Sequence, residues 1–128
     1  MKDDNLKHGA FGWTELMTTN HGAAETFYSA LFGWDLEAYP MADKQYTVVK
    51  VNEEPVGGIM SIPPEASGMP PTWSVYVTVD DVDFTAAQVE TLGGKILRQP
   101  MDIAEIGRFC VLQDPQGATI CAITYLNK

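Results

Sequence analysis

A faint internal repeat constrains this chain more than any other feature of its sequence. Identical residues recur at an offset of 60 positions, as in the pairs Thr18–Thr78 and Gly33–Gly93. The matches fall at turns and helix ends, where the backbone geometry restricts which residue fits. A repeat of this kind predicts two copies of one structural unit.

Each copy is expected to form a strand, a helix and then three strands. In the first copy, alternation predicts a strand over 11–18, and helical spacing predicts a helix with Asn20 as its N-cap and Gly33 as its C-cap. Three short β-rich runs complete this copy, at 34–39, 46–51 and 56–62.

The second copy repeats the pattern. The run 73–79 is the clearest strand of the chain, and the following helix begins after Asp80–Asp81 and ends at Gly93–Gly94. The last strands are expected at 95–98, 107–112 and 118–125, with Asp114–Gly117 as the turn between the last two. The sequence thus predicts a single α+β domain over 1–128, with module one at about 8–62, a proline-rich linker at 63–72 and module two at about 73–128.

Charge and composition exclude several classes of partner. The formal net charge of −9 argues against binding to nucleic acid or to an anionic membrane. No apolar run has the length of a membrane helix, and the polar start Met1–Asn5 predicts no signal peptide. Two cysteines do not make the disulfide framework of a secreted domain. We therefore expect a cytoplasmic protein.

Three motifs resemble one family. The stretch Asn20–Trp34 resembles the first helix of vicinal-oxygen-chelate proteins, the superfamily of glyoxalases, bleomycin-resistance proteins and extradiol dioxygenases. The stretch Val79–Gly94 is similar to their second helix, and Asp114–Gly117 to the turn before their last strand. The resemblance implies two βαβββ modules that form an eight-stranded curved mixed sheet, a cup with helices on its outer face and the pocket between the halves.

The metal ligands of that family are replaced in this chain. Many family enzymes hold a divalent metal in the cup through His and Glu side chains. The corresponding positions fall on Trp13, Ser74 and Cys121, and the run 56–62 contains no His, Asp or Glu. The resemblance, read position by position, therefore predicts no metal site and no cofactor.

Strand alternation selects the residues that could line the cup. If Trp13 points inward, Glu15 and Met17 share its face. A carboxylate in an apolar cup would have a raised pKa and could act as a general base or acid, with Tyr76 or Arg108 as its partner. The alternative is a structural role for Glu15, at a strand edge or in a pair with Arg108 or Tyr76. The residues expected to line the pocket are Trp13, Met17, Met60, Ser74, Tyr76, Cys110 and Cys121.

The two cysteines allow more than one interpretation. Cys110 and Cys121 are equally distant from the turn Asp114–Gly117, so a hairpin would place them directly opposite each other. They could form a redox pair or a soft-metal site. Free cysteines are more often small buried hydrophobic residues, and we expect this role here.

Two hypotheses about function remain open. In the first, the chain is a glyoxalase- or bleomycin-resistance-like module that binds a small, partly apolar molecule without the family metal. In the second, it is a lyase, isomerase or dioxygenase-type enzyme with Glu15 as general base, so whether it is an enzyme stays undecided. We also expect a homodimer, because each half leaves strand edges exposed.

Overall fold

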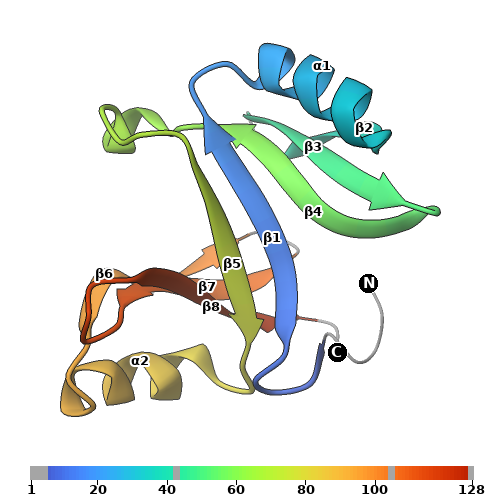
Figure 1. Ribbon diagram of the computed structural model, residues 1–128. Helices are drawn as coiled ribbons and strands as arrows, with labels where there is room; N and C mark the ends of the chain where they lie inside the picture. The colour runs from blue at the N-terminus through green and yellow to red at the C-terminus, as the bar shows by residue number, and fades with distance from the viewer. Residues whose placement is uncertain (1–5, 42–43, 104–105, 127–128) are drawn as a thin grey trace. The chain divides into compact units, whose positions relative to one another are not determined.

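The computed structural model describes residues 6–41, 44–103 and 106–126 (Figure 1). Its elements follow the expected order of two βαβββ copies. The first copy consists of β1 (Phe11–Thr18), α1 (His21–Phe32), β2 (Asp35–Met41), β3 (Lys44–Val51) and β4 (Glu54–Ser61). The second consists of β5 (Thr72–Thr78), α2 (Val82–Thr91), β6 (Lys95–Ile103), β7 (Gly107–Gln113) and β8 (Thr119–Tyr125).

The strands form one mixed sheet in the order β2-β3-β4-β1-β5-β8-β7-β6. The first strand of each copy pairs in parallel with the last, β1 with β4 and β5 with β8, and the remaining pairs within each copy are antiparallel. The predicted α+β fold class is thereby confirmed. Contacts along the chain define two compact units, a first unit of Trp13–Ser74 and a second unit of the residues up to Gly12 and from Val75.

Helix α1 begins and ends where its sequence predicts. The Asn20 side chain accepts a hydrogen bond from the Ala23 amide at 3.0 Å, which satisfies one of the free N–H groups of the first turn. Gly33 ends the helix at φ 71°, a left-handed conformation that glycine adopts without steric cost, and its N–H donates to the Ser29 carbonyl.

The two helices cover their sheets to different extents. In the first unit, Leu16, Val49 and Ile59 form the buried cluster on the face that carries α1, yet no residue of α1 is itself buried. In the second unit, α2 buries Val82, Ala86 and Val89. Two of these join a core cluster whose other members are Val79, Cys110 and Ala122.

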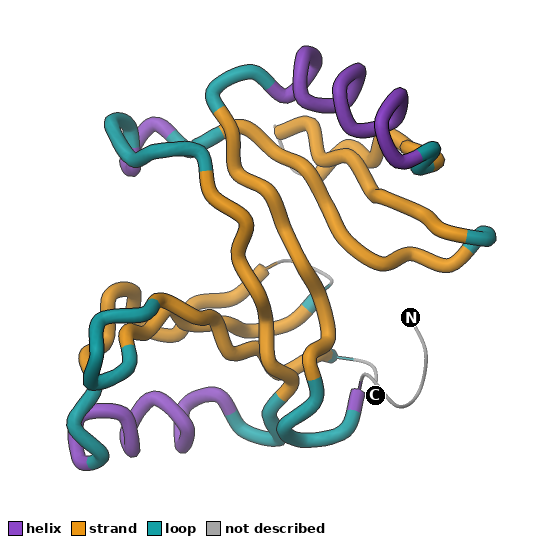
Figure 2. Tube along the Cα trace, viewed as in Figure 1, coloured by secondary structure: helices purple, strands orange, loops and turns teal. Residues whose placement is uncertain are grey.

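Two segments differ from the sequence-based expectation. Strand β6 continues past Arg98 to Ile103, because register shifts on both sides of Arg98 let the strand run through Pro100, which cannot donate a ladder hydrogen bond. The linker between β4 and β5 is a loop apart from the one 3₁₀ turn Pro64–Ala66 (Figure 2).

The hairpin between β7 and β8 corrects the predicted pairing of the cysteines. Its loop has an additional residue, since the Asp114 amide donates to the Ala118 carbonyl and the Asp114 carboxylate accepts from the Ala118 amide. The register therefore pairs Cys110 with Ala122, and Cys121 with Val111. The prediction that the cysteines lie directly opposite each other was wrong, and because they are one position out of step they point to opposite faces.

Among the described residues, neither helix is both long enough and apolar enough to cross a bilayer.

Candidate functional site

A chain of two hydrogen bonds links three polar groups of the first unit. The indole Nε1–H of Trp13 donates to the Tyr46 hydroxyl oxygen at 2.8 Å, and the Tyr46 hydroxyl donates to Glu15 Oε2 at 2.7 Å. An indole N–H can only donate, so its bond to the phenol oxygen leaves the phenol proton for the carboxylate. The two hydrogen bonds therefore run in one direction, from the Trp13 donor through the Tyr46 hydroxyl to the Glu15 acceptor.

The two hydrogen bonds can form because the strand between Tyr46 and Glu15 has a glycine where the Tyr46 side chain crosses it. In the sheet, β4 lies between β3 and β1, so the Tyr46 side chain must cross β4 to reach Glu15. The residue paired with Glu15 on β4 is Gly58. A Cβ at Gly58 would lie 1.8 Å from the Tyr46 hydroxyl oxygen, far inside contact distance. The Tyr46 phenol therefore occupies the space that a side chain at position 58 would need.

The register confirms which side chains of β1 share the face of this site. Trp13 and Glu15 both contact the hydroxyl of Tyr46, so they lie on one face, and Met17 follows by alternation. Met17 pairs with Met60 of β4, two positions beyond Gly58. This face is opposite to the one that packs against α1, to which the intervening Leu16 points.

The site combines a buried carboxylate with half-buried apolar groups. Glu15 is only 8% exposed, whereas Trp13, Tyr46, Met17 and Met60 are half-buried. A buried carboxylate needs hydrogen-bond partners, and the phenol of Tyr46 supplies one. The face therefore offers aromatic and thioether surface next to a fixed polar group.

Tyr76 and Cys121 lie together in the second unit. They are paired across β5 and β8, and both are buried. The Tyr76 ring contacts Phe109, with ring centroids 6.2 Å apart. Ser74 is half-buried near the end of the first unit. The roles of these three residues in binding stay predictions.

Arg108 is held by carboxylates of its own unit. Its guanidinium donates to both oxygens of Asp83, at 2.9 and 3.0 Å, and to Asp102 at 3.1 Å, and these hydrogen bonds raise the pKa of Arg108. Arg108 alternates with Phe109 on β7, so it lies on the opposite face of the strand from the Tyr76 contact. We therefore leave Arg108 out of the proposed site.

Cys110 is part of the core beneath α2. Its side chain is fully buried among Val79, Val82 and Ala86, and burial raises the pKa of the thiol. A thiol with a raised pKa is a poor nucleophile and a poor metal ligand at neutral pH. Cys110 is therefore also left out of the proposed site.

A second polar cluster lies on the α1 face of the first unit. His21 Nδ1 is 3.1 Å from Glu25 Oε2, and the buried Thr47 hydroxyl donates to the same oxygen at 2.9 Å. Glu25 stands at the i+4 position from His21, which faces it on a helix. Thr47 and His21 together hold the Glu25 carboxylate, which connects the start of α1 to β3.

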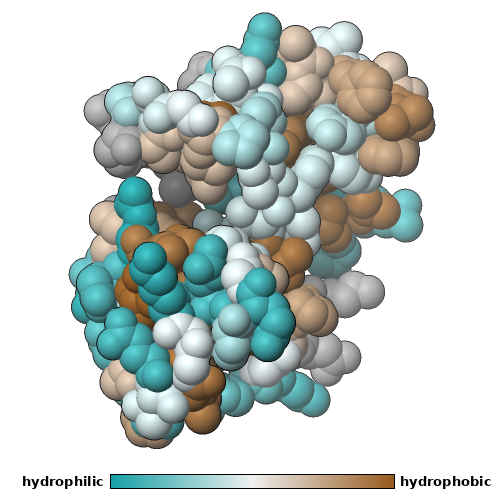
Figure 3. Space-filling model, turned by 60° about the vertical axis from the view of Figure 1, so that its left-hand side comes forward, coloured by the Kyte–Doolittle hydropathy of each residue, from teal (hydrophilic) through white to brown (hydrophobic). Residues whose placement is uncertain are grey.

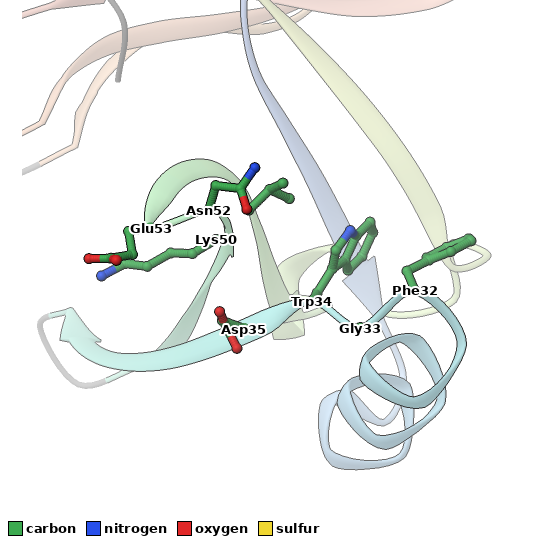
Figure 4. A pocket seen from close by; sticks show the side chains of 8 residues that line it. Phe32, Gly33, Trp34, Asp35, Lys50, Asn52 and Glu53 are labelled. Atoms are coloured by element: carbon green, nitrogen blue, oxygen red, sulfur yellow. The ribbon is translucent and has the colours of Figure 1, made fainter.

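A depression of about 420 Å³ lies elsewhere in the first unit (Figure 4). Phe32 and Trp34 stand on one side of it, and Lys50 and Glu53 on the other. Lys50 is paired with Glu37, which raises the pKa of Lys50. None of the residues predicted to bind a ligand lines this depression, and its lining is mostly polar, so we assign it no role.

The residues at the family's metal positions do not fit a metal. The indole of Trp13 has no lone pair to offer, and its N–H is bonded to Tyr46. Cys121 offers a single thiol, and the run 56–62 contains no His, Asp or Glu to join it. In the part of the chain that the structure describes, no three His, Cys, Asp or Glu side chains gather as metal ligands would.

Strand alternation predicted Trp13, Glu15, Met17 and Met60 as residues of this site but did not predict Tyr46. The strand that contains Tyr46 was predicted. The contacts of the Tyr46 side chain depend on the order of strands in the sheet, and alternation within one strand does not reveal that order. The neighbouring pair Gly57–Gly58 was the available signal, because a glycine inside a strand often marks a place where another group approaches closely.

Comparison with known proteins identifies the family. The model of the Glyoxalase/Bleomycin resistance protein/Dioxygenase superfamily matches residues 10–122, so the chain belongs to this superfamily. The resemblance seen in the sequence is thereby confirmed.

Named relatives come from bacteria. The chain is 37% identical to the candidate glyoxylase CFP32 of Mycobacterium tuberculosis over 122 residues, which are 93% of this chain and 47% of the relative. It is 33% identical to the anthracycline biosynthesis protein DnrV of Streptomyces peucetius over 125 residues, 86% of this chain and 45% of the relative. The chain thus spans about half the length of these curated relatives.

A solved structure supports the fold. Methylmalonyl-CoA epimerase from Mycobacterium tuberculosis superposes with a TM-score of 0.66 at 15% identity, over 98% of this chain and 93% of that one. At this level of identity the similarity establishes the shared fold alone.

Proposed function

We propose that this chain binds a small, partly apolar molecule on the face of the first unit that carries Trp13, Glu15 and Tyr46, without the metal of its family. The observation that carries the proposal is the hydrogen-bonded chain from the Trp13 indole through Tyr46 to Glu15. It holds two aromatic rings and a carboxylate in fixed positions on the face where alternation also places Met17 and Met60.

The chemistry of this face suits a flat molecule with one hydrogen-bonding group. Ligand sites are mostly apolar, with a few fixed polar groups that orient the ligand. Trp13 and Tyr46 supply ring surface, and the flexible thioethers of Met17 and Met60 can adapt to an irregular outline. Glu15 supplies the polar group. The description of DnrV as an anthracycline biosynthesis protein supports the inclusion of polycyclic aromatic compounds among the probes.

A thermal-shift screen with purified, EDTA-treated protein tests the proposal. The probes are small aromatic compounds, among them indole, quinoline and a soluble anthracycline. We expect at least one to raise the melting temperature, since a molecule that binds only the folded state stabilises it. Trp13→Ala and Tyr46→Phe should abolish the shift. The matched control is Tyr39→Phe, which removes the same hydroxyl group from the residue that pairs with Tyr46 across β2 and β3.

Two results would contradict the proposal. In one, a shift persists undiminished in Trp13→Ala. In the other, purified protein that has not met EDTA carries stoichiometric zinc, nickel, manganese or iron, and binding is lost when that metal is removed.

A second function is favoured by the burial of Glu15. A buried carboxylate that receives a phenol proton in a hydrogen bond can serve as general base toward a bound ligand, in an enzyme of the lyase, isomerase or dioxygenase type. The description of CFP32 as a candidate glyoxylase supports the same direction. If Glu15→Gln keeps the binding of a probe and removes its turnover, as followed by NMR of the probe, the enzyme hypothesis is supported. If the wild-type protein turns over no bound probe, the binding function stands alone.

A further inference from the structure

The two faces of the sheet in the first unit offer a ligand different side chains. On the side of α1 the large exposed residues, such as Phe27 and Leu31, are apolar, and hydrophobic surface gathers in the upper part of Figure 3, where α1 lies. The other face carries the buried carboxylate of Glu15 beside the rings of Trp13 and Tyr46, and we call it the Glu15 face. A flat apolar ring can pack on either side, so the charged group of a ligand is what the Glu15 face can select.

The polar hydrogens of the Glu15 face are directed toward its own oxygens. The Trp13 N–H donates to the Tyr46 oxygen at 2.8 Å, and the Tyr46 hydroxyl donates to Glu15 Oε2 at 2.7 Å. An ionised carboxylate has about four lone-pair positions and no hydrogen to donate. These three groups therefore present acceptor oxygens to a ligand, and such oxygens favour a ligand that donates.

Strand pairing places a second carboxylate on the Glu15 face. Gly58 of β4 pairs with Glu15 on one side and with Val48 on the other. Val48 in turn pairs with Glu37 of β2. Paired residues of neighbouring strands share one face of a sheet, so Glu37 lies on the same side as Glu15. The Lys50 ammonium donates to Glu37, so an anionic ligand would have to compete with this carboxylate for the lysine.

The first unit as a whole is acidic. Residues 13–74 contain eight aspartates and glutamates but two lysines, a formal charge of −6 out of the −9 of the whole chain. A field of this sign attracts cations and repels anions. The ring faces of Trp13 and Tyr46 add an attraction for a cation that lies over them. Charge and hydrogen bonding therefore favour the same kind of ligand.

We infer that the Glu15 face selects a flat aromatic amine in its protonated form, with Trp13 and Tyr46 in contact with the ring and Glu15 as the specificity-determining charge. An aromatic carboxylate of the same shape is rejected. Because Glu15 is buried, its charge is weakly screened by solvent and acts strongly at short range. This inference rests on the proposed function, since it takes the same face as the binding site, and it adds the charge of the ligand.

Three indole compounds that differ only in the end group of the side chain test this selectivity. Tryptamine carries an ammonium group near neutral pH, tryptophol a hydroxyl group and indole-3-acetate a carboxylate. Each is titrated calorimetrically into the whole, EDTA-treated chain at about 150 mM salt, where distant surface charges are largely screened. We expect tryptamine to bind at least about 10-fold more tightly than indole-3-acetate, with tryptophol between them.

Two matched variants assign the selectivity to one carboxylate. Glu15→Gln removes the charge but keeps an acceptor oxygen, so the preference for tryptamine over indole-3-acetate should fall below about 3-fold while tryptophol still binds. The control is Glu25→Gln, which removes the same charge from α1, on the other side of the sheet. This control should keep the full preference. Far-UV circular dichroism and melting temperature check that both variants are folded.

The results separate this inference from the function on which it rests. Equal affinities of the wild type for tryptamine and indole-3-acetate would overturn the inference and leave the binding function in place, and this comparison does not depend on whether Glu15→Gln folds. A preference that survives in Glu15→Gln, or that falls equally in Glu25→Gln, would also overturn it. Failure of all three compounds to bind would overturn the proposed function and the inference with it.

Discussion

The two units have the same order of elements but differ in how much of the helix is buried against the sheet. Helix α2 covers its sheet with three buried residues, while α1 buries none and exposes Phe27 and Phe32. The hydrogen bonds from Trp13 through Tyr46 to Glu15 lie in the first unit. In the second unit, Arg108 forms ion pairs with Asp83 and Asp102, and Cys110 lies in the core. The first unit thus carries the hydrogen-bonded polar groups and the exposed helix side chains, while the helix of the second unit is part of a buried core.

The largest effect is expected from Gly58→Ala. Its new methyl group would occupy the space of the Tyr46 hydroxyl, which cannot move without losing its bonds to Trp13 and Glu15. We expect a loss of about 3 kcal/mol in the free energy of unfolding, at the upper end for an overpacked site, measured by urea denaturation. In a Tyr46→Ala background the same substitution should cost less than about 1 kcal/mol. Equal costs in the two backgrounds would show that Gly58 serves another purpose.

The contrast between the helices should appear in paired truncations. Val82 of α2 is 1% exposed, so Val82→Ala removes two buried methyl groups and should cost about 2 kcal/mol. Leu31→Ala on α1 should change stability by no more than about 0.5 kcal/mol. Both are measured by urea denaturation of the purified chain. A large loss for Leu31→Ala would contradict the contrast between the two helices.

The smallest effect, of opposite sign, is expected from Gly22→Ala. Gly22 lies in the first turn of α1, does not have a positive φ, and has room for a methyl group, since the nearest atom would be 3.7 Å away. Alanine restricts the unfolded chain more than glycine does, so the variant should gain about 0.5–1 kcal/mol. Gly33→Ala is the control, because its φ of 71° makes alanine strained and should give a loss. Thermal melts that rank the two variants the other way would be incompatible with the assigned helix ends.

The sequence predicted the features that depend on neighbouring residues. Asn20 and Gly33 could be assigned as caps because capping needs only local geometry, and alternation correctly placed Trp13 and Glu15 on one face. Features that depend on strand order could not be predicted. Tyr46 reaches Glu15 only because β4 lies between their strands and has a glycine at the crossing point.

The pairing of the cysteines failed for a related reason. A hairpin register depends on the length of its loop, and one additional residue at Ala118 moved Cys110 and Cys121 to opposite faces of the sheet. The exposure of α1 was equally hidden, since the apolar residues Phe27 and Leu31 fit the helical pattern of a covered helix. Patterns identify apolar side chains but not what covers them.

The indole signals of the three tryptophans give the most direct test of the proposed binding face. A compound that stabilises the EDTA-treated protein is titrated into ¹⁵N-labelled chain, with each indole N–H assigned through its Trp→Phe variant. We expect the Trp13 signal to move with saturation, while the signals of Trp34 and Trp73, whose rings contact each other and Tyr28 of α1, stay in place. Movement of Trp34 and Trp73 without Trp13, or a shift that requires an added divalent metal, would contradict it.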